Sequence, residues 1–178
     1  MILIVYAHPH HSRSIAHRAL LDAVRDLPDV QVNSLYDRYP DFDIDVEAEQ
    51  AQLAQASLVV WQHPIYWYSP PALLKLWFEV VLMRGWAYGT GGTALRGKGC
   101  LWVTSTGSAE EDYRPGASHG HPFTAFVPAV ERTAVLCGMA WQPPLVVHGA
   151  HRVDRSALAA QAAQYRLRLE QWNGHSHG

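Results

Sequence analysis

Hydrophobic residues along the chain form short apolar runs, separated by longer segments in which apolar positions recur every three or four residues. Short runs with almost no polar position are typical of strands that are covered on both faces. They predict strands at residues 2–6, 30–35, 57–62, 99–104 and 141–148. The periodic segments predict amphipathic helices at residues 14–27, 46–55, 70–82, 123–137 and 154–172.

Strands that alternate with helices pair in parallel through right-handed crossovers, so this pattern predicts a single three-layer α/β domain over residues 1–178. Pro143-Pro144 interrupts the last strand and predicts an edge position or a bend. In such a sheet a ligand binds outside the carboxyl ends of the strands, at the switch point of the strand order. The segments that matter most are therefore the loops after the first, third and fourth strands.

Glycine and proline mark where the regular elements end. Pro70-Pro71 opens a helix where a missing N–H costs little, and Gly138 follows the 123–137 helix as a C-terminal cap would. Residues 85–99 contain six glycines and predict a long shaped loop. Residues 36–43 and 105–121 are predicted to be irregular.

Composition and charge restrict the class of protein. A hydrophobic content of 48% and a charged content of 17% in 178 residues describe one folded domain with one good core. The net charge of −2 offers no basic field for nucleic acid. Cys100 and Cys137 lie in apolar surroundings and predict buried, reduced thiols. No apolar run is long enough for a membrane span, and the apolar start is too short for a signal peptide, so we expect a soluble cytoplasmic protein.

The loop after the first strand, residues 8–17, combines hydroxyls, imidazoles and the start of a helix. Free backbone N–H groups at a helix start, together with Ser12 and Ser14, would suit a phosphate. The alternative is that Ser14 only caps the helix. The four histidines of this loop also suggest a metal site. No cysteine or carboxylate stands at ligand spacing, however, and we expect no metal.

The loops after the third and fourth strands offer flat faces and close backbone approach. Tyr66, Trp67 and Tyr68 follow the third strand and could contact a planar heterocycle, although packing or a subunit interface is the alternative. Ser105 to Ala109 are small residues that let the backbone approach a ligand. Tyr113 and His119, just beyond them, are candidates for moving a proton or balancing charge. Together the three loops predict a site for a phosphorylated planar cofactor.

The chain also resembles a known family over residues 1 to about 172, the flavodoxin-fold NAD(P)H-quinone reductases of the DT-diaphorase type. It is most similar to the small bacterial branch of ancillary subunits (the KefF/KefG type) of glutathione-gated potassium efflux systems. The most specific matching stretches are Ile2 to Pro9, Ser34-Leu35-Tyr36, Tyr39 to Phe42, Ile44-Asp45, Trp61 to Pro64, Trp67-Tyr68, Pro71 to Trp77, Gly85 to Gly89, Gly91 to Leu95 and Gly97-Lys98.

The resemblance implies a flavodoxin-like fold with strand order 2-1-3-4-5 and a non-covalent FMN. It places the FMN phosphate at His8, Ser14, Ile15, Ala16 and His17. The ring would lie along Pro64, Ile65, Tyr66, Trp67, Tyr68, Ser105, Thr106, Gly107 and Ser108. Tyr113 and His119 fall where family members carry a Tyr and a His in the reductase pocket. The family pattern has Asn where this chain has His17, and a second Gly where this chain has Ser108.

The implied activity is two-electron transfer from NAD(P)H through FMN to a quinone, carried out by a homodimer with its sites at the subunit boundary. The resemblance also implies a regulatory contact with a potassium–proton antiporter at the cytosolic face of the inner membrane. Two alternatives are an antiporter-binding subunit with incidental reductase activity and a general flavin reductase. A third, a one-electron flavodoxin carrier, is disfavoured by the long 85–99 loop and by the Tyr113/His119 pair.

Overall fold

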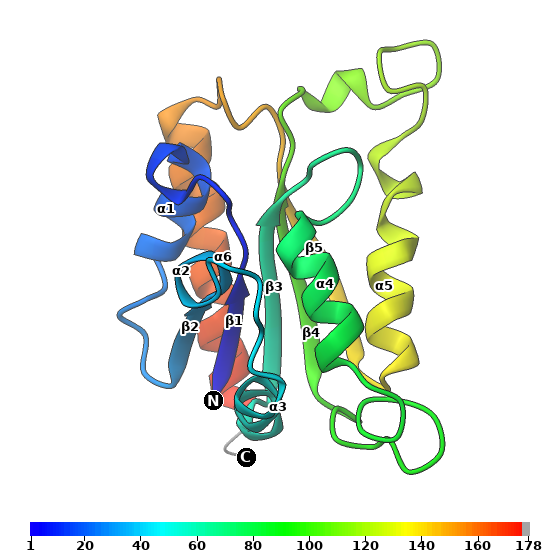
Figure 1. The fold of residues 1–178 in the computed structure, drawn as a ribbon. Helices are drawn as coiled ribbons and strands as arrows, with labels where there is room; N and C mark the ends of the chain where they lie inside the picture. Colours follow the sequence, from blue (N-terminus) through cyan, green and yellow to red (C-terminus); the bar gives the residue numbers. More distant parts are fainter. Residues whose placement is uncertain (176–178) are drawn as a thin grey trace.

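A parallel sheet of five strands lies at the centre of the structure, a computed structural model that describes residues 1–175 and side chains as far as Trp172 (Figure 1). The strand order is β2-β1-β3-β4-β5, which confirms the predicted flavodoxin-like order. The strands are β1 (Ile2–Tyr6), β2 (Val30–Ser34), β3 (Leu58–Pro64), β4 (Gly99–Ser105) and β5 (Ala140–Val147). All four neighbouring pairs are parallel.

Helices cover both faces of this sheet (Figure 1). The α-helices are α1 (Ile15–Asp22), α2 (Leu35–Arg38), α3 (Val46–Gln55), α4 (Ala72–Val81), α5 (Val127–Leu136) and α6 (Arg155–His175). Three short 3₁₀ turns, η1 (His11–Arg13), η2 (Glu110–Asp112) and η3 (Phe123–Ala125), lie in the connecting loops.

The period-2 alternation of the strands separates two hydrophobic cores. In β1, Ile2 and Ile4 pack with the apolar stripes of α1 and α6, whereas Leu3 and Val5 pack with residues of α3, α4 and α5. Both faces of the central strands are therefore buried, which explains why these strands are mostly apolar. The exceptions are buried polar residues near the carboxyl ends of β3 (Gln62, His63) and β4 (Thr104, Ser105). Both cysteines are buried and unpaired, as predicted.

The two prolines of β5 lie at a bulge on an edge strand. β4 and β5 stay in register up to Leu101 and Gln142 and resume at Val103 and Leu145, so two residues of β5 lie opposite one of β4. Proline is tolerated there because it need not donate to the sheet. The prediction of an edge position or a bend is confirmed in both respects.

Three predicted element boundaries are wrong. The 14–27 helix ends at Asp22, and the chain continues in turns while Val24 and Leu27 stay in the core. The predicted 36–43 loop begins with the single turn of α2. The 123–137 helix is split into η3 and α5, with Gly138 following at a φ of 74°. In the described part of the chain, no helix has both the length and the apolar character needed to cross a membrane.

Candidate functional site

The carboxyl ends of β1, β3, β4 and β5 surround a cavity of about 390 Å³. Each wall is supplied by the loop that follows one of these strands, as expected for a ligand site at the switch point of a parallel sheet. The lining residues are His8, His10, Arg13, Ser14, Ile15, Ala16, Pro64, Ile65, Tyr66, Ser105, Thr106, Gly107, Ala150 and His151.

The first turn of α1 presents unpaired backbone donors to this cavity. Ser14 caps the helix, and its hydroxyl accepts the N–H of His17 at 3.1 Å. The backbone N–H groups of Ile15 and Ala16 have no acceptor among the described residues. A helix N-terminus with free N–H groups favours an anion, and Ser14 supplies the cap without occupying these two donors.

His8 adds a neutral imidazole to the same wall. Burial, with smaller contributions from His11 and His10, lowers its pKa to about 4, so the ring is uncharged at neutral pH. Its Nδ1 accepts the backbone N–H of His10 at 3.0 Å. In the neutral ring the hydrogen therefore sits on Nε2, which makes His8 a donor through that atom.

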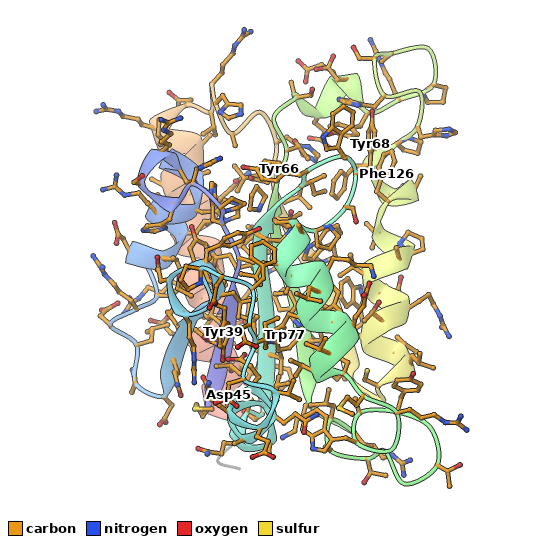
Figure 2. The ribbon with its side chains drawn as sticks, in the orientation of Figure 1. Tyr39, Asp45, Tyr66, Tyr68, Trp77 and Phe126 are labelled. Carbon is orange, nitrogen blue, oxygen red and sulfur yellow. The ribbon has the colours of Figure 1, made fainter. Side chains whose placement is uncertain are left out.

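The aromatic loop after β3 is a tight reverse turn. Tyr66 and Ser69 exchange two backbone hydrogen bonds of 3.0 Å, and Trp67 and Tyr68 between them have φ values of 51° and 63°. Two successive left-handed residues with large side chains are strained, and such strain is concentrated at functional sites. The turn leaves Trp67 93% exposed and places Tyr68 in a stack on Phe126 (Figure 2).

The loop after β4 places backbone N–H groups of small residues at the cavity. The Thr106 hydroxyl donates to the carbonyl of Ser108 at 2.7 Å and lies 3.0 Å from His148 Nδ1, which fixes the turn. The N–H groups of Gly107 and Ser108 have no acceptor in the part of the chain that the structure describes. They form a second set of free donors, of which Gly107 lines this cavity and Ser108 lines a neighbouring one.

A smaller cavity of about 210 Å³ adjoins the first and shares Ile65 and Gly107 with it. The rings of Tyr113 and His119 stack in its wall with centroids 4.1 Å apart, and the Tyr68 hydroxyl lies 3.2 Å from His119 Nδ1. Burial raises the pKa of Tyr113, so its hydroxyl keeps its proton at neutral pH. His119 Nε2 is buried and has no partner among residues 1–175. Ser108, Trp67 and Tyr68 line this second cavity.

His17 is the one predicted site residue whose side chain lines neither cavity. Its imidazole is 1% exposed, and its Nε2 lies 2.9 Å from Ser105 Oγ. Burial holds the pKa of this ring well below its ordinary value. The structure brings the other predicted residues together around the two cavities, and it places His17 behind Ser105, outside the lining of both.

Sequence reasoning missed the wall supplied by the loop after β5. His151 lies beside Gly107, where a Cβ would be 3.7 Å from its ring, and Ala150 lies next to it in the cavity wall. The signal that could have found them is their position at the carboxyl end of the fifth strand. His10 and Arg13, in the first loop, were also not assigned a role by the sequence.

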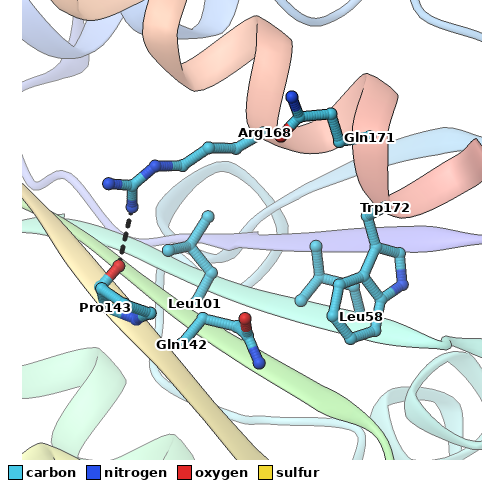
Figure 3. Close-up of a pocket in the computed structure, with 7 residues that line it drawn as sticks. All are labelled: Leu58, Leu101, Gln142, Pro143, Arg168, Gln171 and Trp172. Atoms are coloured by element: carbon cyan, nitrogen blue, oxygen red, sulfur yellow. Dashed lines mark hydrogen bonds between the residues drawn. The ribbon is translucent and has the colours of Figure 1, made fainter. Parts of the chain in front are cut away.

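A third cavity, of about 520 Å³, lies between α6 and the amino-terminal halves of β3, β4 and β5 (Figure 3). Leu58, Leu101, Gln142 and Pro143 line it from the sheet, and Arg168 of α6 donates to the carbonyl of Pro143 at 2.7 Å. It holds no histidine, acid or hydroxyl among its lining residues, so we place the candidate site at the carboxyl ends.

Comparison with known proteins agrees with this geometry. The family described as having a flavodoxin-like fold matches residues 1–171. The glutathione-regulated potassium-efflux system ancillary protein KefF of Salmonella typhi is 48% identical over 178 residues, which is the full length of both chains. The general stress protein 14 of Treponema denticola, solved in complex with FMN, has a TM-score of 0.89 and 37% identity, with 96% of this chain and 98% of that chain covered. An NADPH-quinone reductase from P. pentosaceus has a TM-score of 0.84 and 30% identity, with 93% and 95% covered.

Proposed function

The chain belongs to the flavodoxin-like fold family, and on this premise we propose that it is an FMN-dependent NAD(P)H:quinone oxidoreductase. The observation that carries the proposal is a cavity at the carboxyl ends of the strands with free backbone donors from the first turn of α1 and from the loop after β4. The Treponema denticola protein of the same fold was solved with FMN, and the P. pentosaceus protein is named an NADPH-quinone reductase. Both matches cover more than nine tenths of this chain.

The residues present fit FMN. The N–H groups of Ile15 and Ala16 and the Nε2–H of His8 would hold the phosphate, since they are donors and the helix start favours negative charge. The N–H groups of Gly107 and Ser108 would donate to the polar edge of the ring, and Ile65 and Tyr66 would pack against it. When bound, FMN would supply the two-electron redox chemistry between the nucleotide and the acceptor.

The second cavity is where the chain's own residues would act on the substrates. Tyr113 keeps its proton and can donate a hydrogen bond, and the buried Nε2 of His119, which has no partner among the described residues, would be free to contact a ligand or a second subunit. The contact between Tyr68 and His119 Nδ1 holds the imidazole in place against Tyr113. This pair would orient a quinone oxygen and balance the charge that develops on it.

The proposal is tested by the absorption spectrum of the purified protein and by oxidation of NADH or NADPH in the presence of FMN and a quinone. We expect a yellow protein and nucleotide oxidation that depends on the acceptor. Replacing Tyr113 with Phe together with His119 with Ala should lower kcat by about 100-fold or more while FMN stays bound. Absence of acceptor-dependent oxidation by the FMN-loaded protein would refute the proposed activity.

The full-length match to KefF supports a second role, as an ancillary subunit that regulates a potassium efflux antiporter. This role would place the protein in the cytoplasm, against the cytosolic face of the inner membrane. It is compatible with reductase activity, because the exposed aromatic loop and the two cavities of the candidate site lie at the carboxyl ends of the strands and leave the rest of the surface for a partner. Co-purification with an antiporter and potassium efflux with and without the protein test it. The Tyr113→Phe/His119→Ala variant separates regulation from catalysis.

A homodimer fits the exposed aromatic side chains beside the site. Trp67 is almost fully exposed, and Tyr66 and Tyr68 are partly so, on a turn that also lines both cavities. Burying these rings against a second subunit would remove a large apolar surface from water and close the second cavity.

A further inference from the structure

Four buried polar side chains from four elements form a connected series of contacts that ends at the 390 Å³ cavity at the carboxyl ends of the strands. The Tyr165 hydroxyl of α6 donates to Gln62 Oε1 of β3 at 3.1 Å. Gln62 Nε2 lies 3.5 Å from His17 Nδ1 of α1, and His17 Nε2 lies 2.9 Å from Ser105 Oγ of β4. All four side chains are almost completely buried, and only Ser105 lines the cavity.

The orientation of the Gln62 amide follows from its neighbours. Its Nε2 also lies 3.4 Å from the backbone carbonyl oxygen of His17, where an amide oxygen would face another oxygen. The nitrogen must therefore point toward α1, and the oxygen must point toward the Tyr165 hydroxyl. Both N–H groups of the amide then face His17, one toward its carbonyl and the other toward its ring.

This orientation determines which nitrogen of His17 carries the hydrogen. The Nδ1 atom faces an N–H group and must accept, so in the neutral ring the hydrogen sits on Nε2. Nε2 then donates to Ser105 Oγ. Burial, which lowers the pKa of His17, keeps the ring in this neutral form. Because Ser105 Oγ accepts from His17, its own hydrogen must point elsewhere, and no other acceptor for it lies among the described residues.

We infer that His17 is a positioning residue whose Nε2–H tautomer turns the Ser105 hydroxyl into a hydrogen-bond donor directed into the cavity. The ligand it serves is one that presents an acceptor atom, a ring nitrogen or a carbonyl oxygen, at the end of β4. This inference rests on the proposed function in taking that ligand to be FMN. The donor-to-acceptor direction of these hydrogen bonds is set within the protein, before any ligand binds.

The tautomer is measured directly on the protein without FMN, by a long-range ¹⁵N–¹H correlation spectrum of the histidine rings. The signal assigned to His17 by its loss in His17→Asn should show a protonated Nε2 and a bare Nδ1. A protonated Nδ1 in the wild-type protein overturns the inference, whatever the protein does with FMN.

The consequence for binding is measured by titrating apoprotein with FMN. Ser105→Ala should weaken FMN binding about 5- to 15-fold, and Ser105→Thr should restore most of it because it keeps the hydroxyl. Gln62→Glu places a carboxylate oxygen opposite His17 Nδ1. If the same ¹⁵N spectrum shows that the ring stays neutral in this variant, its hydrogen must sit on Nδ1 and Ser105 must donate to Nε2. Gln62→Glu should then weaken binding as much as Ser105→Ala does, and the double variant should show no additional loss.

The matched control is Gln55→Glu, the same chemical change at an exposed position of α3, which should bind FMN as the wild type does. If Gln62→Glu does not fold, the wild-type tautomer and the Ser105→Ala/Ser105→Thr pair still decide the question. Equal FMN affinity of wild type and Ser105→Ala contradicts the inference. Failure of the wild type to bind FMN contradicts the proposed function instead, and leaves the tautomer measurement standing.

Discussion

Glu49 of α3 is a fully buried carboxylate that accepts hydrogen bonds from three other segments of the chain. Its Oε2 accepts from Asn33 Nδ2 at 2.6 Å and from Trp77 Nε1 at 2.7 Å, and its Oε1 accepts from the Tyr39 hydroxyl at 2.7 Å (Tyr39 and Trp77 in Figure 2). These partners belong to β2, to α4 and to the residue that follows α2. Arg38, 3.6 Å away, is the nearest cation. The carboxylate therefore joins the loop after β2 to the helix that follows the aromatic turn.

Removing this acceptor leaves three buried donors without a partner. At about 2 kcal/mol for each of the three unsatisfied donors, and with about 1–2 kcal/mol offset by the added apolar surface of leucine, Glu49→Leu should destabilise the fold by about 4–5 kcal/mol. Glu49→Gln keeps one oxygen for two of the donors and places its amide nitrogen opposite the Tyr39 hydroxyl, which can rotate to accept. Its cost should be about 1–2 kcal/mol. Against a typical total of about 5–15 kcal/mol, only the leucine variant threatens folding.

Urea unfolding followed by tryptophan fluorescence measures both costs, provided that the slope with denaturant stays the same in all variants. Glu47→Gln, an exposed change on the same helix, is the control and should shift the free energy of unfolding by less than about 0.5 kcal/mol. A Glu49→Leu cost below about 1 kcal/mol, or equal costs for leucine and glutamine, would show that the hydrogen bonds are not what stabilises this junction.

Three further predictions concern pH, association and backbone space. Burial lowers the pKa of His63 from 6.5 to about 4 in the folded protein. As pH falls from 6.5 to 4 the unfolded chain therefore binds a proton at His63 that the folded chain does not, which should lower the free energy of unfolding by about 3 kcal/mol. Unfolding of His63→Gln across that range should show a flatter pH dependence, and an unchanged slope argues against it. Trp67→Ala should weaken self-association at least tenfold in analytical ultracentrifugation without lowering thermal stability, whereas Leu167→Ala, also exposed, should change neither. A Cβ at Gly92 would lie 2.2 Å from the Tyr88 carbonyl oxygen, so Gly92→Ala should cost about 2 kcal/mol or more in urea unfolding. Gly97→Ala meets no atom within 4 Å and should cost only the roughly 1–2 kcal/mol of its left-handed φ; equal costs would contradict the steric explanation.

The pattern of buried residues was sufficient to predict the strands of the sheet, but it was not sufficient to predict where the helices end. β1, β3 and β4 are buried at every position, so an apolar run marks each of them, up to the buried polar residues at the carboxyl ends of β3 and β4. The end of α1 could not be found in the same way, because Val24 and Leu27 continue the apolar stripe while their backbone has left the helix. Hydrophobic periodicity reports which side chains are buried, and it does not report where the backbone hydrogen bonds change.

The candidate site was predictable where a loop had a distinctive composition. The aromatic triplet after β3 and the small residues after β4 stand out in the sequence, and the structure places both in the cavity wall. The loop after β5 has no such composition, and Ala150 and His151 join the site only because β5 lies beside β4. No sequence rule relates them to Gly107, which is distant along the chain.

The role of His17 could not be predicted from the local sequence. In the sequence it belongs to a polar loop beside a helix start, and an imidazole there is naturally read as a ligand contact. Its environment is set by Ser105, 88 residues away, and by Gln62, 45 residues away, which supply one partner for each ring nitrogen. A buried imidazole needs both partners to avoid the cost of an unsatisfied polar atom. The same pairing that buries the ring also fixes the direction of its hydrogen bonds, so the residue can influence the cavity through Ser105 without reaching it.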